Sequence, residues 1–244
     1  MTPPARRGRM PAVSDADIRR VAAELLVSHG AEALTLRAIA RELGITAPAL
    51  YRYYPSREEL LAALRRDICK RLADDLAAQV AELPDDGVVR LFAICRAFRR
   101  WALAHRNEFT LVFASPSDGN PGTVRRFDES FGLVFLEAAG KVLGAYDLAP
   151  PPVESIPEAL RTDLIAFQTE LFALLAGSEQ KFPAEKFDLG VAYLMMIVWV
   201  RLYGHVTLEV FGNYPMPVSD PDVLFDAVLT DLAAGIGLAA GDTA

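Results

Sequence analysis

The sequence predicts an all-α protein of about nine helices, in which a small N-terminal domain precedes a larger helical one. Apolar residues recur with helical spacing along most of the chain, and no segment alternates as a β-strand would. Two stretches rich in Gly and Pro, "SPSDGNPG" at 115–122 and "LAPPPVESIP" at 148–157, predict loops between helices. The chain has 244 residues, of which 52% are hydrophobic, so it can bury a sizeable core.

The first 13 residues predict a flexible basic arm, because Arg6, Arg7 and Arg9 are interspersed with prolines and a glycine. The first helix is expected to begin at Ser14, with Asp17 three residues later, and to stop at Gly30. One face of this helix is apolar: Ile18, Val21, Ala22, Leu25 and Leu26.

The next two predicted helices are short and closely spaced, as in a helix-turn-helix. The second follows Thr35 and ends at Gly44, where the tight turn needs a positive φ. Ala40 is small at the expected crossing point, and Pro48 lies in the first turn of the third helix, where a missing N–H costs little. The second helix of such a motif enters the DNA major groove by its N-terminal end. We therefore expect bases to face Thr46, Ala47, Pro48 and Ala49, and phosphates to face Tyr51, Tyr53 and Arg57.

A long fourth helix is predicted from Ser56 to about residue 82. Ser56 and Glu59 have the spacing of a capping box, and a stripe of apolar residues follows them. The predicted DNA-binding domain thus covers residues 14–60, and a ligand-binding and dimerisation domain covers 61–244. Further helices are expected at 87–106, 107–114, 124–144, 157–177, 184–211 and 221–238.

The charge is unevenly distributed. Residues 1–70 carry 12 Lys or Arg residues against 8 Asp or Glu, whereas the rest of the chain carries 13 against 24. A basic head on an acidic body indicates that only the head meets a polyanion. Cys69 and Cys95 have no metal-ligand spacing and are expected to be buried free thiols. No apolar signal core follows the basic N-terminus, and the apolar run Leu189–Val200 is too short to cross a bilayer, so a cytoplasmic protein without a membrane partner is expected.

The segment "TLRAIARELGITAPALYRYYPSREELL", from Thr35 to Leu61, resembles the TetR family of bacterial transcription regulators. It departs from the usual pattern at Arg57, where lysine is commoner, and at Tyr53–Tyr54, where His–Phe is common. The resemblance implies that Thr35 and Arg37 touch the DNA backbone, that the Tyr51 hydroxyl bonds a phosphate, and that Tyr54 packs against the first helix. Arg52 could face either the solvent or the DNA groove, and neither position is favoured over the other.

The segment "VWVRLYGHVTLE" resembles the C-terminal domain of a TetR subfamily named for a Trp–His–Gly pattern. Trp199 and Gly204 match, but Tyr203 occupies the histidine position and His205 follows the glycine. The resemblance implies that this half forms a dimer and binds a small molecule, although aromatic and Met stripes are more often plain core. The candidate pocket residues are Phe109, Phe113, Phe131, Phe135, Phe167, Phe172, Tyr193, Met196, Trp199 and Tyr203.

An enzyme is not expected, and no catalytic residue, cofactor or metal is predicted. His29, His105 and His205 lie in separate segments, and the chain lacks GxSxG, P-loop and Rossmann glycine patterns. Four arginines at 96, 99, 100 and 106 could hold an anion, but the solvated face of a helix is favoured. The resulting hypothesis is a ligand-responsive repressor that binds a near-palindromic DNA operator as a homodimer and responds to a largely apolar effector. The alternative is a cytosolic carrier of a hydrophobic molecule without DNA binding.

Overall fold

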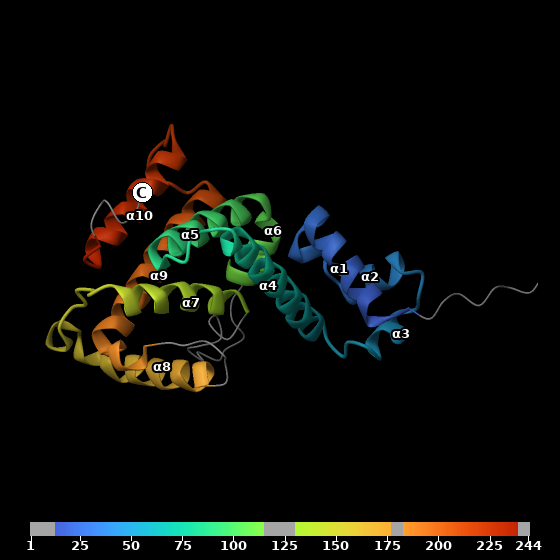
Figure 1. The fold of residues 1–244 in the computed structure, drawn as a ribbon. Helices are drawn as coiled ribbons and strands as arrows, with labels where there is room; N and C mark the ends of the chain where they lie inside the picture. Colours follow the sequence, from blue (N-terminus) through green and yellow to red (C-terminus); the bar gives the residue numbers. More distant parts are fainter. Residues whose placement is uncertain (1–12, 115–129, 177–182, 239–244) are drawn as a thin grey trace, which may run out of the picture.

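The described part of the chain is helical and contains no β-strand, which confirms the all-α prediction (Figure 1). The computed structural model describes residues 13–114, 130–176 and 183–238. These residues form ten α-helices, against the expected nine or so. The helices are α1 (Asp15–His29), α2 (Leu36–Glu42), α3 (Ala47–Tyr51), α4 (Arg57–Ala81), α5 (Gly87–Ala104), α6 (Arg106–Phe109), α7 (Ser130–Ala145), α8 (Glu158–Ala176), α9 (Leu189–Phe211) and α10 (Pro221–Gly235).

Polar side chains begin the N-terminal helices where the sequence predicts them. Ser14 and Asp17 form a complete capping box: the Ser14 hydroxyl accepts a bond from the Asp17 N–H, and the Asp17 carboxylate accepts one from the Ser14 N–H. The Ser56 hydroxyl accepts a hydrogen bond from the Glu59 N–H, which is one of the two hydrogen bonds of the predicted capping box. Gly44 has a φ of 65°, so the turn between α2 and α3 has the left-handed conformation that the sequence predicts.

Several helices in the larger part of the chain have other boundaries than expected. Helix α5 ends at Ala104 because His105 leaves the helical conformation, and α6 continues as a π-helical turn at Thr110–Ala114. Helix α9 begins at Leu189, where the Asp188 carboxylate caps the Val191 N–H, rather than at 184. The first part of the helix expected at 124–144 lies outside the described residues, which show α7 from Ser130.

Helices α1 to α3 form a head at one end of the molecule, and α4 runs from this head into the body (Figure 1). In the body, α5 and α7 pack against α4 and against each other, and α9 contacts α5, α8 and α10. A continuous apolar core extends from Ile18 and Leu50 in the head, through Leu64 on α4, to Phe98 on α5. Since full burial of one such side chain contributes about 1.5–3 kcal/mol, this core holds the head on the body.

Candidate functional site

The N-terminal end of α3 is exposed at two of its first positions. Thr46 is its N-cap residue and is exposed, and Pro48 lies in the first turn and is exposed. The Thr46 side chain makes no capping bond to α3, so its hydroxyl is available at the helix end. Ala47 and Ala49 are half-buried, while Leu50 is fully buried beneath them. The end of α3 therefore offers small side chains and one hydroxyl, an arrangement suited to contact with base edges.

The N-terminus of α2 lies next to this turn in the sequence and presents a second polar end. The Thr35 hydroxyl accepts a bond from the Ala38 N–H, and both Thr35 and Arg37 are exposed. Helix N-termini attract anions through unpaired N–H groups and the helix dipole. Thr35 and Arg37 are thus placed for phosphate contact, and that role stays a prediction.

The aromatic residues after α3 divide into two groups. Tyr51 is 49% exposed and Tyr53 43% exposed, and Arg52 is also exposed. Tyr54 is buried, and its hydroxyl donates a 2.5 Å bond to a carboxylate oxygen of Asp15 on α1. Burial and this bond raise the pKa of Tyr54. The prediction that Tyr54 packs against the first helix is confirmed.

Arg57 has a structural role that the sequence did not indicate. Its Nε donates to the Leu34 carbonyl at 2.6 Å, and its Nη2 donates to the Ala31 carbonyl at 2.7 Å. These bonds tie the segment before α2 to the start of α4. A role on a phosphate stays a prediction for Arg57, but two of its five donors are already used.

The start of the described chain is held beside α3. The Tyr53 hydroxyl donates a 2.7 Å bond to the Val13 carbonyl. The predicted basic arm, residues 1–13, lies otherwise outside the described residues. Its point of attachment is therefore beside the C-terminal end of α3.

Polar contacts join the head to the body around a groove of about 620 Å³ between α1, α4 and α6. Arg19 on α1 pairs with Asp67 on α4 at 2.7 Å, and Arg71 on α4 pairs with the buried Glu108 on α6 at 2.8 Å. The side-chain amide of Asn107 on α6 donates to the Val27 carbonyl on α1. Movements of α6 can therefore reach both α4 and α1.

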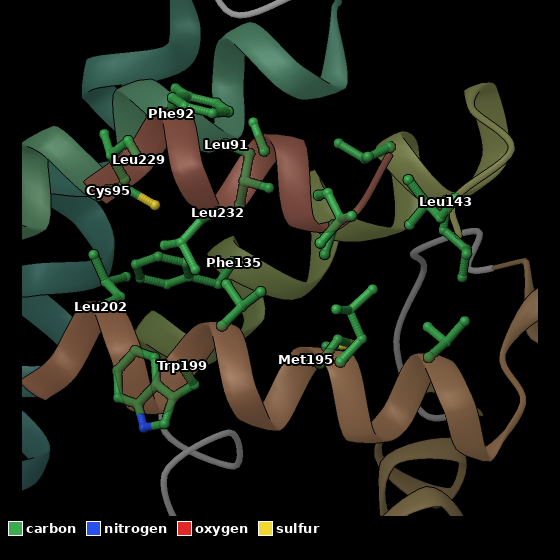
Figure 2. A pocket seen from close by; sticks show the side chains of 18 of the residues that line it. Leu91, Phe92, Cys95, Phe135, Leu143, Met195, Trp199, Leu202, Leu229 and Leu232 are labelled. Atoms are coloured by element: carbon green, nitrogen blue, oxygen red, sulfur yellow. The ribbon is translucent and has the colours of Figure 1, made fainter. Parts of the chain in front are cut away.

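A narrow apolar cavity of about 120 Å³ lies in the body between α5, α7, α9 and α10 (Figure 2). Of the ten predicted pocket residues, only Phe135 and Trp199 line it. Its other lining residues are Leu91, Phe92, Cys95, Leu136, Ala139, Val142, Leu143, Leu148, Val191, Leu194, Met195, Val198, Leu202, Leu229, Leu232, Ala233 and Ile236.

The remaining predicted pocket residues lie in two other places. Phe109, Phe113, Phe131 and Tyr203 form an aromatic core with Phe98, in which neighbouring ring centroids lie 5.1–6.3 Å apart. The Tyr203 hydroxyl donates to the Phe113 carbonyl at 2.8 Å, so it acts in packing. The second group belongs to the smaller apolar cluster between α7, α8 and α9: Phe167, Phe172, Tyr193 and Met196.

Most of the cavity residues could not be recognised in the sequence from aromatic side chains. The cavity is lined mainly by Leu, Val and Ala, which look like ordinary core in a sequence. The available indication was the spacing on the last helix, where Leu229, Leu232, Ala233 and Ile236 recur on one face.

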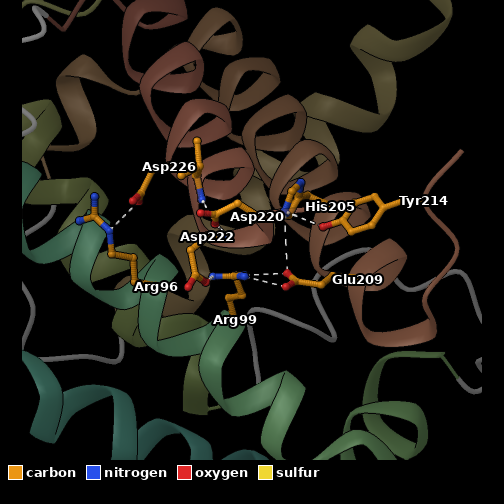
Figure 3. A network of polar contacts seen from close by, with 9 residues as sticks. Arg96, Arg99, His205, Glu209, Tyr214, Asp220, Asp222 and Asp226 are labelled. Carbon is orange, nitrogen blue, oxygen red and sulfur yellow. Dashed lines mark hydrogen bonds and ion pairs between the residues drawn. The ribbon is translucent and has the colours of Figure 1, made fainter. Parts of the chain in front are cut away.

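A buried charged network fastens α5, α9 and α10 together near the cavity (Figure 3). Arg99 is only 7% exposed; it donates two 2.6 Å bonds to the Glu209 carboxylate and one of 2.7 Å to Asp222. The bond to Glu209 raises the pKa of Arg99 above its already high value. The expectation of a solvated face is therefore wrong for Arg99, whose charge is compensated inside the fold.

His205 extends this network. Its Nε2 lies 3.1 Å from the Tyr214 hydroxyl and 3.9 Å from a Glu209 oxygen. Burial lowers the pKa of His205 against the opposing effect of Glu209. Within residues 13–114, 130–176 and 183–238, no cluster of His, Cys, Asp or Glu could hold a metal ion. Cys69 and Cys95 are buried, as predicted, and they are not joined in a disulfide.

Helix α9 is long and apolar enough to cross a membrane by length and composition alone, with 23 residues and a mean hydropathy of 1.5. The sequence analysis considered only the run to Val200, but the helix continues to Phe211. In the structure α9 packs among α5, α8 and α10, and Arg201 and Glu209 interrupt its apolar surface.

Comparisons with known families match both parts of the chain. Residues 18–64 match "Bacterial regulatory proteins, tetR family", and residues 91–232 match "Tetracyclin repressor-like, C-terminal domain". The first match covers α1 to α3 and the beginning of α4. The second covers the helices that enclose the cavity and carry the charged network.

Several individual proteins are also similar. The HTH-type transcriptional regulator Rv1816 of Mycobacterium tuberculosis is 33% identical over 224 residues, which cover 87% of this chain and 88% of the relative. The class A tetracycline repressor protein of Escherichia coli is 35% identical over 88 residues, 36% of this chain and 39% of that protein. Among solved structures, the regulatory protein SCO4313 has a TM-score of 0.55 and 30% identity, and the match covers 90% of this chain and 94% of that one.

Proposed function

This chain belongs to the tetR family of bacterial regulatory proteins, and from that premise we propose that it is a ligand-responsive repressor that binds a near-palindromic operator as a homodimer. The observation that carries this proposal is the exposed N-terminal end of α3, with an available Thr46 hydroxyl, in a head that matches the family. Proteins related to this one are transcriptional regulators, which are not enzymes.

The proposed DNA surface combines base contacts from the end of α3 with phosphate contacts around it. Its residues are Thr35, Arg37, Thr46, Ala47, Pro48, Ala49, Tyr51, Arg52, Tyr53 and Arg57. The exposure of Tyr51 and Arg52 supports this assignment. Arg57 would contact phosphate while keeping its bonds within the head, since three of its five donors remain. Tyr53 has one O–H, so it would have to release the Val13 carbonyl to donate to a phosphate.

The proposed dimer forms through α8 and α9. On α9, Val200 is 56% exposed, Leu208 40% and Phe211 42%. Together with Gly204 these residues form one stripe along the helix, at positions i, i+4, i+8 and i+11 counted from Val200. Val198 and Leu202, which line the cavity, lie on the opposite face. A helix with two apolar faces needs both faces to be shielded from water. On α8, Ile165 is 51% exposed and extends the apolar surface that is open to water. A second copy of the chain would supply the cover.

The body would bind the effector in the cavity, and the domain boundary would lie near residues 60 and 61 on α4. The closer relation to the Trp–His–Gly subfamily is part of the proposal. It is supported by the place of Trp199 on the cavity and of Gly204 on the open stripe, while Tyr203 in the histidine position packs in the core. We expect a protein with this function to be cytoplasmic and not to be an enzyme. Because residues 18–64 match the tetR family, a carrier without DNA binding is not favoured.

The test is a gel-shift titration with DNA from the region upstream of the protein's own gene, at low salt. We expect a shifted complex whose stoichiometry is two chains per operator and which requires Thr46. Thr46→Val keeps the shape of the residue but removes the hydroxyl, and Thr230→Val, at an exposed threonine on α10, is the matched control. Absence of a shift at any protein concentration would favour the carrier.

A further inference from the structure

We propose that the cavity in the body accepts an unbranched aliphatic chain, such as the tail of a fatty alcohol or fatty acid, rather than a compact ring system. This inference rests on the proposed function, because it names the class of effector that the regulator would sense. Binding to the free protein can nevertheless be measured without DNA. The length, the width and the chemistry of the cavity each favour such a ligand.

The cavity is long. Lining residues on α9 extend from Val191 to Leu202, which is roughly 16 Å at about 1.5 Å per residue. Figure 2 shows their side chains in a row along the helix, with Leu229 and Leu232 of α10 facing them across the gap. An extended chain can follow such a row over its whole length.

The cavity is also narrow. Pockets for drug-sized ligands usually enclose roughly 300–1,000 Å³, whereas this one encloses about 120 Å³. It is also somewhat smaller than the apolar void of about 150 Å³ that holds benzene. Because the volume is spread along α9 instead of being concentrated in one place, a slender ligand fills more of it than a ring does.

The lining offers almost no polar partner. No Asp, Glu, Lys, Arg or His lines the cavity. Cys95 is buried, and burial raises the pKa of its thiol to about 12, so it carries no charge. Figure 2 shows the Trp199 indole nitrogen on the side of the ring away from Leu229 and Leu232. The buried part of the ligand must therefore be purely hydrocarbon, and any polar head group must stay outside.

The first experiment compares 1-dodecanol with cyclododecanol, which have the same number of carbon atoms but different shapes. Binding to the full-length protein is followed by tryptophan fluorescence, because Trp199 lines the cavity whereas Trp101 does not. We expect 1-dodecanol to bind at least about tenfold more tightly. In a series from 1-hexanol upward, affinity should rise about fourfold per methylene group until the chain exceeds the cavity length. Equal or tighter binding of cyclododecanol would overturn the proposal.

The second experiment uses a matched pair of variants on α10. Ala233 lines the cavity and Ala234, its neighbour, is exposed. Ala233→Leu should fill the space of two or more methylene groups and weaken 1-dodecanol binding at least about tenfold. Ala234→Leu should leave it unchanged. If the two variants weaken binding equally, the ligand does not occupy this cavity.

A third variant covers the case in which Ala233→Leu does not fold. Leu194→Ala widens the cavity from the α9 side, so it should lose affinity for 1-dodecanol and gain affinity for cyclododecanol. An unchanged preference would contradict the shape argument. Failure of the proposed function is a separate outcome: the alcohol then binds as expected, but it does not change the gel shift of the upstream DNA.

Discussion

Single side chains decide between binding and packing in the head. Tyr51, Tyr53 and Tyr54 are close together in the sequence, yet two are exposed and one is buried against α1. The difference arises because α3 ends at Tyr51, after which the chain turns and directs Tyr54 inward. Chemically similar residues therefore have different expected effects when they are mutated.

Tyr51→Phe should weaken binding to all DNA sequences alike while leaving stability unchanged, because it removes the proposed phosphate contact of an exposed residue. Tyr54→Phe should reduce the free energy of unfolding by about 1.5–3 kcal/mol, the usual net contribution of a hydrogen bond to a charged group such as the Asp15 carboxylate. Salt-dependent gel shifts and urea unfolding measure the two effects. Loss of DNA affinity in a fully folded Tyr54→Phe protein would contradict this division.

His205 should make stability depend on pH on the acid side. Its folded-state pKa is lowered, so the unfolded chain takes up the proton first as the pH falls. Above the unfolded value of 6.5 the residue contributes nothing; as the pH falls through 6.5 towards the folded pKa, stability is lost. Arg99, Glu209 and Tyr214 face the ring.

His205→Gln should therefore lose less stability than the wild type between about pH 7.5 and about pH 5.5. Urea unfolding at the two pH values measures the difference. His29→Gln, at an exposed position on α1, is the control and should behave as the wild type. An identical acid loss in all three proteins would assign the pH dependence to other groups.

At the scale of elements, α10 is attached to the body by charge as well as by apolar contact. Arg99 on α5 bonds to Glu209 on α9 and to Asp222 at the start of α10. The Arg99 guanidinium also lies over the Phe225 ring, with its central carbon 4.9 Å from the ring centroid. Because α10 also forms one wall of the cavity, this network helps to fix the shape of the cavity.

Arg99→Met should destabilise the protein by about 3–5 kcal/mol, since it leaves the Glu209 carboxylate buried without its partner. Arg100→Met, at the exposed neighbouring position, should change stability little. Thermal and urea unfolding measure both. A double variant, Arg99→Met with Glu209→Met, should recover part of the loss, because no buried charge is then left unpaired.

The basic arm is the other element with an expected role. Its point of attachment at Val13 lies beside α3 through the Tyr53 bond. Deleting residues 1–9 removes three arginines and should lower the slope of log affinity against log salt by up to roughly three. The ligand response should persist. Unchanged affinity and slope would show that the arm is passive.

At the scale of the whole molecule, the open stripe on α9 should determine the oligomeric state. A Cβ placed at Gly204 would meet nothing within 4 Å in the single chain. Gly204→Met should therefore leave the subunit folded but prevent close approach of a second copy. Gly144→Met on α7, at an equally open glycine, is the control. Sedimentation should give a dimer for the wild type and the control and a 26.6 kDa monomer for Gly204→Met.

The sequence by itself determined the fold class, the head and most helix beginnings. These features depend on local interactions: Ser14 with Asp17, the positive φ of Gly44, and Pro48 in the first turn of α3. Such contacts join residues a few positions apart, so their spacing is visible in the chain.

Only the tertiary structure decided which residues line the cavity and which charges are buried. Arg99 and Arg100 look alike in the sequence, but Arg99 faces Glu209, 110 positions away, and Arg100 faces solvent. Phe113 and Phe135 look alike as well, yet only Phe135 reaches the cavity. Helical periodicity gives the inward face of each helix but not the neighbour that meets it. Packing between α5, α7, α9 and α10 leaves the gap, and that packing depends on the shapes of all four helices at once.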